Sequence, residues 1–225
     1  MPHTSNPAGT PDTTPKPRRR DAKQTRERLV RAALELFTSQ GYHASTTPQV
    51  ARRAGVAEGT IYRHFTSKEQ LLNDIYRGAV RVFTQVVRET PSKASCREHM
   101  TDIAVRWGEV AATDAALVKL VFVAPPTSLL DEASRKAHEE MRLELEKVVA
   151  SGKSSGEVRA GPAYLWTDVW LQLVRLMLER VATREWATQH SAPKQVIDSA
   201  WDSIAAAKGV RSAPLPSEAS LPVGR

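Results

Sequence analysis

The sequence predicts an all-α protein with a small N-terminal and a larger C-terminal helical domain. Apolar residues recur every three or four positions through most of the 225 residues, which is the spacing of one face of a helix. No stretch shows the sustained alternation of apolar and polar positions that a half-buried strand requires. Prolines and glycines interrupt the periodic segments, so these segments are expected to form separate helices.

Residues 21–77 are expected to form the N-terminal domain around a helix-turn-helix. A first helix is predicted from Thr25 to Gln40, with its apolar stripe made of Leu29, Ala32, Ala33, Leu36 and Phe37. Thr46 or Thr47 can cap a second helix. Pro48 in the first turn of that helix loses no hydrogen bond that the helix would have made.

The turn and the helix that follow carry the most informative residues. Gly55 supplies the backbone freedom that a tight turn needs. A third helix is predicted from Ala57 to Phe65, with Ile61 and Phe65 facing the core. Its outward positions are small, polar or aromatic: Glu58, Gly59, Thr60, Tyr62, Arg63 and His64.

A fourth, long helix is predicted to begin at Ser67 and to stop before Pro91. Lys68 falls in its first turn, where the helix dipole disfavours a cation. We therefore expect an anion from outside the protein near this lysine.

The spacing of these residues resembles a family signature. It reads Gly55-Val56-x-x-Gly59-Thr60-Ile61-Tyr62-x-His64-Phe65-x-x-Lys68-x-x-Leu71-Leu72, preceded by Phe37, Gly41 and Tyr42. The pattern is similar to the DNA-binding signature of the TetR family, the tetracycline-repressor-like transcriptional regulators. The detailed match covers about residues 25–77. It implies an N-terminal three-helix helix-turn-helix DNA-binding domain, which a long helix joins to a helical ligand-binding and dimerisation domain.

The resemblance also implies which residues read bases. A recognition helix enters the major groove and presents short side chains to base edges. By position, the base-facing group is Glu58, Gly59 and Thr60. Gly59 allows close approach of the backbone, and Thr60 offers a hydroxyl and a methyl group. Glu58 can accept a hydrogen bond from the amino group of cytosine, yet its charge repels phosphate.

Neighbouring residues are expected to hold the DNA backbone. Tyr62 and His64 are interpreted as phosphate or base contacts, and Lys68 and Thr47 as phosphate contacts. Arg63 could bind guanine through two hydrogen bonds or lie beside a phosphate. Alternatively, Tyr62 is a half-buried aromatic residue and His64 an ordinary surface histidine.

Charge is distributed as nucleic-acid binding requires. Residues 1–77 contain 13 Lys or Arg against 7 Asp or Glu, whereas the other 148 residues contain 19 against 18. Residues 1–20 combine five prolines with Arg18, Arg19 and Arg20, and are interpreted as a disordered basic arm. The arginines can touch phosphates or the minor groove. Alternatively, they form a solvated charge run.

The second domain, residues 78–209, is interpreted as helical. Helices are expected near residues 95–112, 114–123, 128–150, 162–187 and 193–208, and a disordered tail at 210–225. In the family this domain holds a small effector that changes the separation of the two DNA-binding heads. The candidate pocket residues are Phe83, Trp107, Phe122, Met141, Leu145, Trp166 and Trp170. Such residues can equally be ordinary core, and the mixed aromatic character hints at an apolar or amphipathic effector.

The last two helices are expected to form the dimer interface. In the family they pair with their copies in a four-helix bundle. The final helix has a matching apolar stripe, from which we assign Ile197, Trp201 and Ile204 to the interface. Alternatively, this stripe is ordinary intrachain core.

Other chemistry is sparse. Cys96 and His99 share a helical face but lack a second cysteine or an orienting carboxylate. The Gly152–Gly156 segment, GKSSG, lacks the spacing of a phosphate loop and is interpreted as a flexible loop. We therefore predict no catalytic residue, no metal and no cofactor. No membrane helix and no secretory signal are expected, and a cytoplasmic location is predicted.

These observations predict a DNA-binding transcriptional regulator and not an enzyme. The expected partners are double-stranded DNA, a second copy of the chain and an unknown small effector. The expected mechanism is a repressor that binds a palindromic operator as a homodimer and is released by the effector. One alternative is a nucleoid-type protein that binds DNA without sequence preference. A second is a helical small-molecule-binding protein or enzyme.

Overall fold

The computed structural model describes residues 19–207, so the prolines and Arg18 of the predicted arm and the predicted tail at 210–225 lie outside the described residues. The described chain is helical except for its connections and one isolated antiparallel bridge between Val158 and Ala205. The predicted all-α class is therefore confirmed. Two compact units divide the chain, Met1–Tyr76 and Arg77–Arg225.

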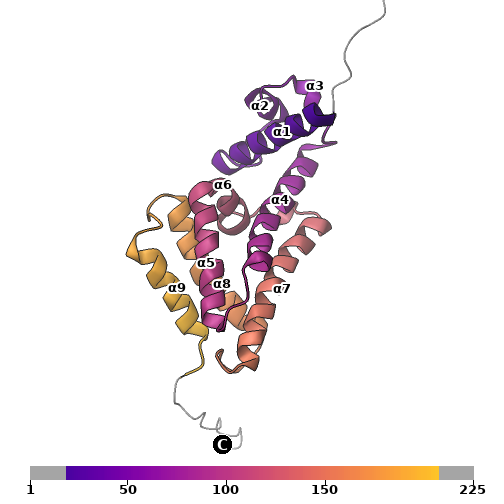
Figure 1. Ribbon diagram of the computed structural model, residues 1–225. Coiled ribbons are helices and arrows are strands. Elements are labelled where there is room, and N and C mark those ends of the chain that lie inside the picture. Colours follow the sequence, from indigo (N-terminus) through magenta and orange to yellow (C-terminus); the bar gives the residue numbers. More distant parts are fainter. Residues whose placement is uncertain (1–18, 208–225) are drawn as a thin grey trace, which may run out of the picture. The chain divides into compact units, whose positions relative to one another are not determined.

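The first unit holds α1 (Arg19–Ser39), α2 (Thr47–Arg53), α3 (Glu58–Ile61) and the start of α4 (Lys68–Glu89), as Figure 1 shows. α1 begins at Arg19 instead of the predicted Thr25, and Asp21 in its first turn favours this earlier start because a carboxylate complements the helix dipole. The core of the unit is built from Leu29, Ala33, Phe37, Val50, Ala51, Ile61, Phe65, Leu71 and Leu72.

The cap of α2 is Thr46. Its hydroxyl accepts a hydrogen bond from the Gln49 amide, and the Gln49 side chain accepts one from the Thr46 amide at 2.8 Å. This reciprocal arrangement satisfies two amides that the helix leaves open. Gly55, in the turn after α2, has φ +66°, a left-handed conformation that favours glycine.

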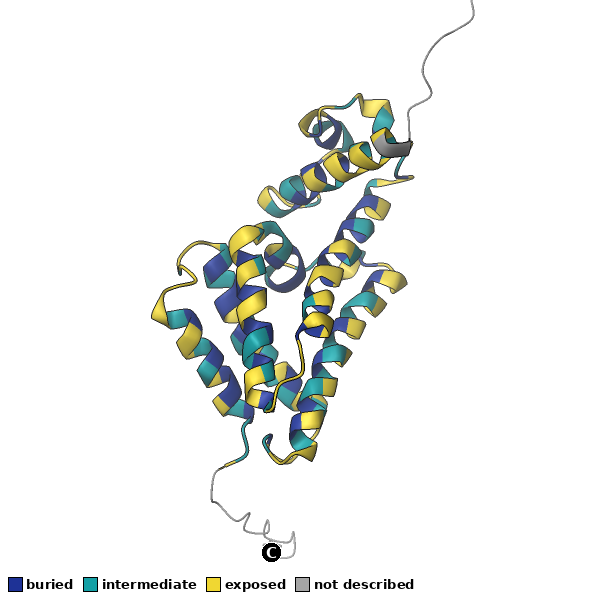
Figure 2. Ribbon diagram, viewed as in Figure 1, coloured by how far each residue is buried: buried dark blue, intermediate teal, exposed yellow. Residues whose placement is uncertain are grey.

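The second unit contains the rest of α4 and the helices that follow it. These are α5 (Cys96–Thr113), α6 (Ala115–Val118), η1 (Lys119–Val123), η2 (Thr127–Leu129), α7 (Glu132–Ser154), α8 (Ala163–Ala182) and α9 (Ser191–Ile204). α5 packs against α7, α8 and α9, and α8 packs along α9. Figure 2 shows that each long helix of this unit has a buried and an exposed face. The single helix predicted at 114–123 is instead a short α-helix that continues as a π-helix.

A short connection closes one end of the second unit. Both carboxylate oxygens of Glu157 lie 3.0 Å from the Cys96 amide at the start of α5. Two residues later, the Arg159 amide donates to Ile204 at the end of α9, and the Ala206 amide donates back to Glu157. We call residues 157–159 the tether segment. The prediction of a flexible loop at Gly152–Gly156 is wrong for its first three residues, which belong to α7 with Gly152 buried against Cys96 and Val158.

Candidate functional site

The outward surface of α3 is supported by two buried side chains. Ile61 and Phe65 are almost completely buried, and they fix the short helix and its following turn onto the core. α3 is shorter than the predicted Ala57–Phe65 helix. After Ile61 the chain continues as a turn, in which the Arg63 amide donates to Thr60 and the His64 amide donates to Ile61.

The predicted base-facing residues lie together on this surface. Glu58 and Gly59 are exposed in α3, and Thr60 is half-buried beside them. A Cβ atom added to Gly59 would meet no atom of residues 19–207 within 4 Å. Neither packing nor backbone conformation therefore requires glycine at this position.

Two of the predicted backbone contacts meet at the start of α2. The hydroxyl oxygens of Thr47 and Tyr62 lie 3.0 Å apart, within hydrogen-bonding distance. The Tyr62 side chain is 56% exposed, so its ring is not part of the core. Arg63 is exposed and His64 half-buried in the turn after α3. The structure thus brings the α2 cap region and the α3 turn to one surface.

Lys68 has partners inside the protein. Its Nζ donates to the Tyr42 carbonyl at 2.5 Å and lies 4.0 Å from the centre of the Tyr42 ring. Burial lowers the pKa of Lys68. An external anion is therefore not needed to explain a lysine in the first turn of α4, which corrects the electrostatic argument from sequence. The carbonyl and ring stabilise the ammonium despite the helix dipole.

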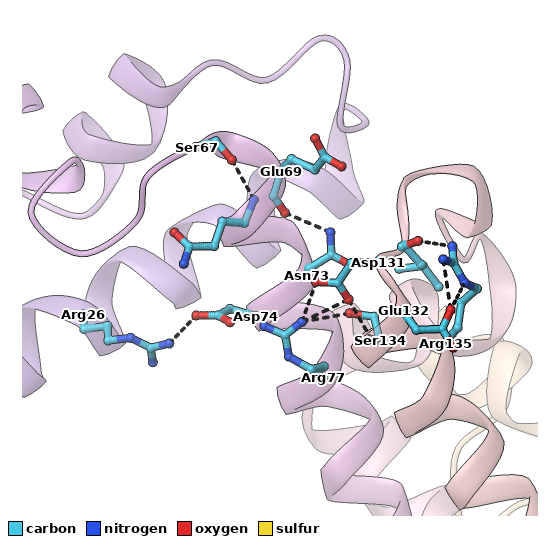
Figure 3. Close-up of polar contacts among 12 residues, drawn as sticks. Arg26, Ser67, Glu69, Asn73, Asp74, Arg77, Asp131, Glu132, Ser134 and Arg135 are labelled. Atoms are coloured by element: carbon cyan, nitrogen blue, oxygen red, sulfur yellow. Dashed lines mark hydrogen bonds and ion pairs between the residues drawn. The ribbon is translucent and has the colours of Figure 1, made fainter.

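Ion pairs between α1, α2 and the start of α4 stabilise the helices that carry the site. Arg26 pairs with Asp74 at 2.6 Å, as Figure 3 shows, and its guanidinium lies 5.2 Å from the Phe65 ring. Glu35 of α1 pairs with Arg53 of α2 at 2.6 Å and also with Arg31. The hydrogen bond from Arg53 is the main cause that lowers the pKa of Glu35. These pairs hold α1 against α2 and the start of α4.

Comparison with known proteins finds a family match that covers the helix-turn-helix. Residues 29–75 match the family model described as bacterial regulatory proteins, tetR family. Over 146 residues the chain is 34% identical to the HTH-type transcriptional regulator TcmR of Streptomyces glaucescens. The chain belongs to the TetR family. The alignment covers 60% of this chain and 62% of TcmR, so it spans less than two thirds of that relative.

Further relatives of this TetR-family chain are also named as regulators. The fatty acid metabolism regulator protein of Bacillus subtilis is 29% identical over 137 residues, which cover 59% of this chain and 70% of that protein. The fold matches a TetR-family regulator from Marinobacter aquaeolei with a TM-score of 0.74 at 17% identity, covering 84% of this chain and 100% of that one. It also matches FadR of Bacillus subtilis, solved in complex with stearoyl-CoA, with a TM-score of 0.66 at 22% identity, covering 79% of this chain and 98% of FadR.

The predicted effector residues of the TetR-family chain fall into two groups. Phe83, Trp107, Phe122 and Trp170 form one aromatic cluster, in which the Phe83 and Phe122 ring centres lie 4.8 Å apart. The Trp107 indole donates to the Phe83 carbonyl at 3.1 Å, so its polar atom is satisfied. Phe83 packs edge to face against Trp107 and Phe122, and Trp107 lies tilted against Phe122 and Trp170, as expected of core residues.

The other three predicted pocket residues do not belong to the aromatic cluster: two lie in the core and one lies at the start of α8. Met141 and Leu145 are fully buried in α7. Trp166 is half-buried at the start of α8, where its indole donates to the Ala160 carbonyl and the Arg159 guanidinium lies over its ring. The structure does not bring Trp166 to the aromatic cluster.

The predicted dimer residues are buried within a single chain. Ile197 and Ile204 are buried, and Trp201 is only 6% exposed, because α9 packs on α8 and α5. The intrachain alternative accounts for this stripe. The prediction that the last two helices form the interface also includes α8, where Leu165 and Leu176 are 41% and 39% exposed. The signal for α8 was the width of the apolar pattern in that helix, which is too wide for one partner.

Within the described residues, no helix is both long enough and apolar enough to cross a membrane.

Proposed function

We propose that this chain is a sequence-specific DNA-binding regulator that reads its operator with α3 and the residues around it. The observation that carries the proposal is the exposed α3 surface with Gly59 at its centre. Buried Ile61 and Phe65 explain why the helix is held in place, whereas no contact within the described residues requires a glycine at position 59. A close approach of DNA does explain it, because a side chain there would collide with a base edge.

The contacts assigned by the family resemblance fit this surface. Glu58, Gly59 and Thr60 face the bases in this proposal. Thr47 and Tyr62 present adjacent hydroxyl groups, of which one can donate to the other while the second donates to a phosphate. His64, Arg63 and Lys68 complete the backbone contacts. Lys68 can use one of its three N–H donors on Tyr42 and still offer another to a phosphate.

The test is DNA binding by fluorescence anisotropy at two salt concentrations. Double-stranded DNA from upstream of the chain's own gene is compared with a scrambled duplex. A preference of about a thousandfold or more supports specific regulation. If neither this DNA nor sites recovered by genome-wide selection are preferred over random duplex, the chain is a non-specific binder and the proposal fails.

Gly59 allows a matched pair of variants. Gly59→Leu adds a side chain to the proposed interface. Gly78→Leu adds the same side chain to α4, where a Cβ atom would also meet no atom of the described part of the chain within 4 Å. We expect Gly59→Leu to lower affinity for the selected site about tenfold to a hundredfold, as the loss of good base contacts does. Gly78→Leu should bind normally. Equal affinities for the two variants would contradict the assignment of α3.

We further propose that the chain acts as a homodimer on a palindromic operator, with α8 as the main contact. Leu165, Val169 and Leu176 recur at helical spacing on the face opposite the buried residues Trp170 and Val174. Pairing this stripe with its copy in a two-fold dimer covers it on both chains. The first units of the two chains can then bind two DNA half-sites whose centres lie about 34–36 Å apart.

Sedimentation of charged variants tests the dimer. Leu176→Glu should yield monomers, whereas Leu143→Glu, at a comparably exposed leucine of α7, should leave the dimer intact. Trp201→Glu should instead unfold the second unit, because it buries a charge within the chain. A Leu176→Glu protein that remains dimeric would remove α8 from the interface.

Finally, we propose that a small apolar or amphipathic effector releases the DNA. Support comes from FadR of Bacillus subtilis, whose solved structure contains stearoyl-CoA. An effector acts only if it binds the released state more tightly than the DNA-bound state. Adding stearoyl-CoA to the preformed DNA complex tests this chemical class directly. Release of the DNA would support coupling between effector binding and DNA binding. If calorimetry shows that stearoyl-CoA binds the protein but the anisotropy of the DNA complex does not change, the proposal is contradicted for this class of effector.

A further inference from the structure

A cavity of about 330 Å³ lies in the second unit between α5, α8 and the start of α9. Its walls are largely apolar and include Ala104 and Gly108 of α5, Met177 of α8 and Ile197 of α9. The volume falls at the lower end of the range for small-molecule pockets, about 300–1,000 Å³. The aromatic cluster does not line it, so the cavity is separate from the effector residues expected from sequence.

Gly108 explains part of the hollow. It lies inside α5, where glycine is a poorer helix former than alanine. A Cβ atom at Gly108 would lie 3.6 Å from the Met177 Sδ, an ordinary contact distance, so packing does not exclude a side chain. At Gly152, by contrast, a Cβ atom would lie 2.4 Å from the Cys96 Sγ. Gly152 is required by packing, whereas Gly108 contributes open space.

The polar groups of the cavity gather at its rim. Lys194 and Asp198 neutralise each other across 2.6 Å, and Asp198 also pairs with Arg97. Glu109 is exposed at the rim, and within residues 19–207 its carboxylate makes no ion pair. Arg106, one turn earlier, does not pair with it. Among the residues that line the cavity, Lys194 and Asp198 cancel in charge, so Glu109 is the lining charge left without an ion pair within residues 19–207. Arg97, the second partner of Asp198, lies outside the lining.

We propose that this cavity binds a compact, mostly apolar molecule that carries one amine group, with the apolar body between Gly108 and Met177 and the ammonium beside Glu109. Met177 suits an aromatic body, because its flexible thioether makes favourable contacts with ring edges. The cavity is too small to enclose a long acyl chain together with a nucleotide head. Binding itself does not depend on the proposed regulatory function, although an effect on DNA would.

Calorimetry on the full chain tests the chemical class with two matched probes. 1-Naphthylmethylamine is cationic, and 1-naphthalenemethanol has the same shape without the charge. We expect both to bind and the amine to bind about twofold to fivefold more tightly, the effect of an exposed ion pair. Glu109→Gln should abolish this preference and leave the alcohol unaffected. Glu98→Gln, at an exposed glutamate of the same helix outside the cavity, should retain the preference.

Methionine NMR tests the location. In protein labelled at the methionine methyl groups, either probe should shift the Met177 signal. Met100 and Met141 are fully buried elsewhere and should not respond. The proposal is overturned if neither probe binds, if the probes bind equally, if Glu109→Gln keeps the preference, or if Met177 does not shift.

DNA affinity measured in the presence of the probes distinguishes failure of this proposal from failure of the proposed regulation. If the probes bind and shift Met177 without changing DNA affinity, the cavity assignment stands and its use as an effector site fails. If stearoyl-CoA releases DNA while neither naphthyl probe binds, the regulatory proposal stands and the cavity assignment fails.

Discussion

Replacing Lys68 with methionine separates a lysine that stabilises the fold from one that grips DNA. Methionine keeps the length of the side chain and its contacts with the Phe37 and Tyr42 rings, but it removes the ammonium. The hydrogen bond to the Tyr42 carbonyl is charge-assisted, a class that contributes about 1.5–3 kcal/mol. The half-buried ammonium also loses hydration on folding, as its lowered pKa indicates. We therefore expect a net loss of about 1 kcal/mol in the first unit.

The assay must report on the first unit itself. All five tryptophans lie beyond residue 76, so tryptophan fluorescence follows only the second unit. Amide hydrogen exchange in α1 does follow the first unit, and a loss of about 1 kcal/mol lowers protection roughly fivefold. Unchanged protection in Lys68→Met would refute the stabilising role of the Tyr42 contact.

DNA binding by the same variant gives the second readout. If Lys68 also contacts a phosphate, the salt dependence of binding becomes shallower by about one counterion. Lys136→Met, at an exposed lysine of α7, should leave the slope unchanged. A normal slope in Lys68→Met combined with reduced protection would make this lysine purely structural.

Three further predictions follow from the geometry. Gly152→Ala should lower the free energy of unfolding by about 1–2 kcal/mol, because overpacking against Cys96 exceeds the gain in helix propensity. Gly78→Ala, at an exposed position of α4, should instead raise it by about 0.5–1 kcal/mol. Urea titrations followed by tryptophan fluorescence measure both changes, and a Gly152→Ala protein more stable than the wild type would contradict the packing argument. Thr60→Ala should cost about 1–3 kcal/mol on the selected operator and less on random DNA, and equal losses in anisotropy would reduce Thr60 to scaffold. Hydrogen bonding from the Cys96 amide lowers the pKa of Glu157 below its usual 4.5, so this carboxylate stabilises the fold above that pH and ceases to do so as the pH falls through its lowered pKa. The stability difference between the wild type and Glu157→Gln should therefore narrow below pH 4.5, and a constant difference would show that the charge is irrelevant.

The helix-turn-helix could be predicted because its determinants are local. The cap at Thr46, the glycine at position 55 and the inward pair Ile61 and Phe65 all act within a few residues of one another. The length of α3 could not be predicted in this way. The turn after Ile61 depends on how Phe65 enters the core, which helix propensity does not describe.

Contacts distant in sequence explain most of the other differences. Lys68 is satisfied by a carbonyl 26 residues earlier, and nothing near Lys68 in the sequence signals that partner. The α9 stripe with Trp201 correctly indicated a buried face, but periodicity cannot tell whether the covering surface belongs to the same chain or to another. The aromatic residues around Trp107 illustrate the same limit. Their composition suits either a pocket or a packed core, and only their ring geometry decides between these.

The tether segment also has a consequence for synthesis on the ribosome. The contacts within the first unit can all form once residue 76 has emerged, so this unit can fold early in translation. Glu157 can cap α5 as soon as α7 is made, but Arg159 and the Glu157 carbonyl must wait for residues 204–206. The second unit is therefore completed only when nearly the whole described chain has left the exit tunnel. Until then the apolar face of α5 that α9 covers stays open to chaperones.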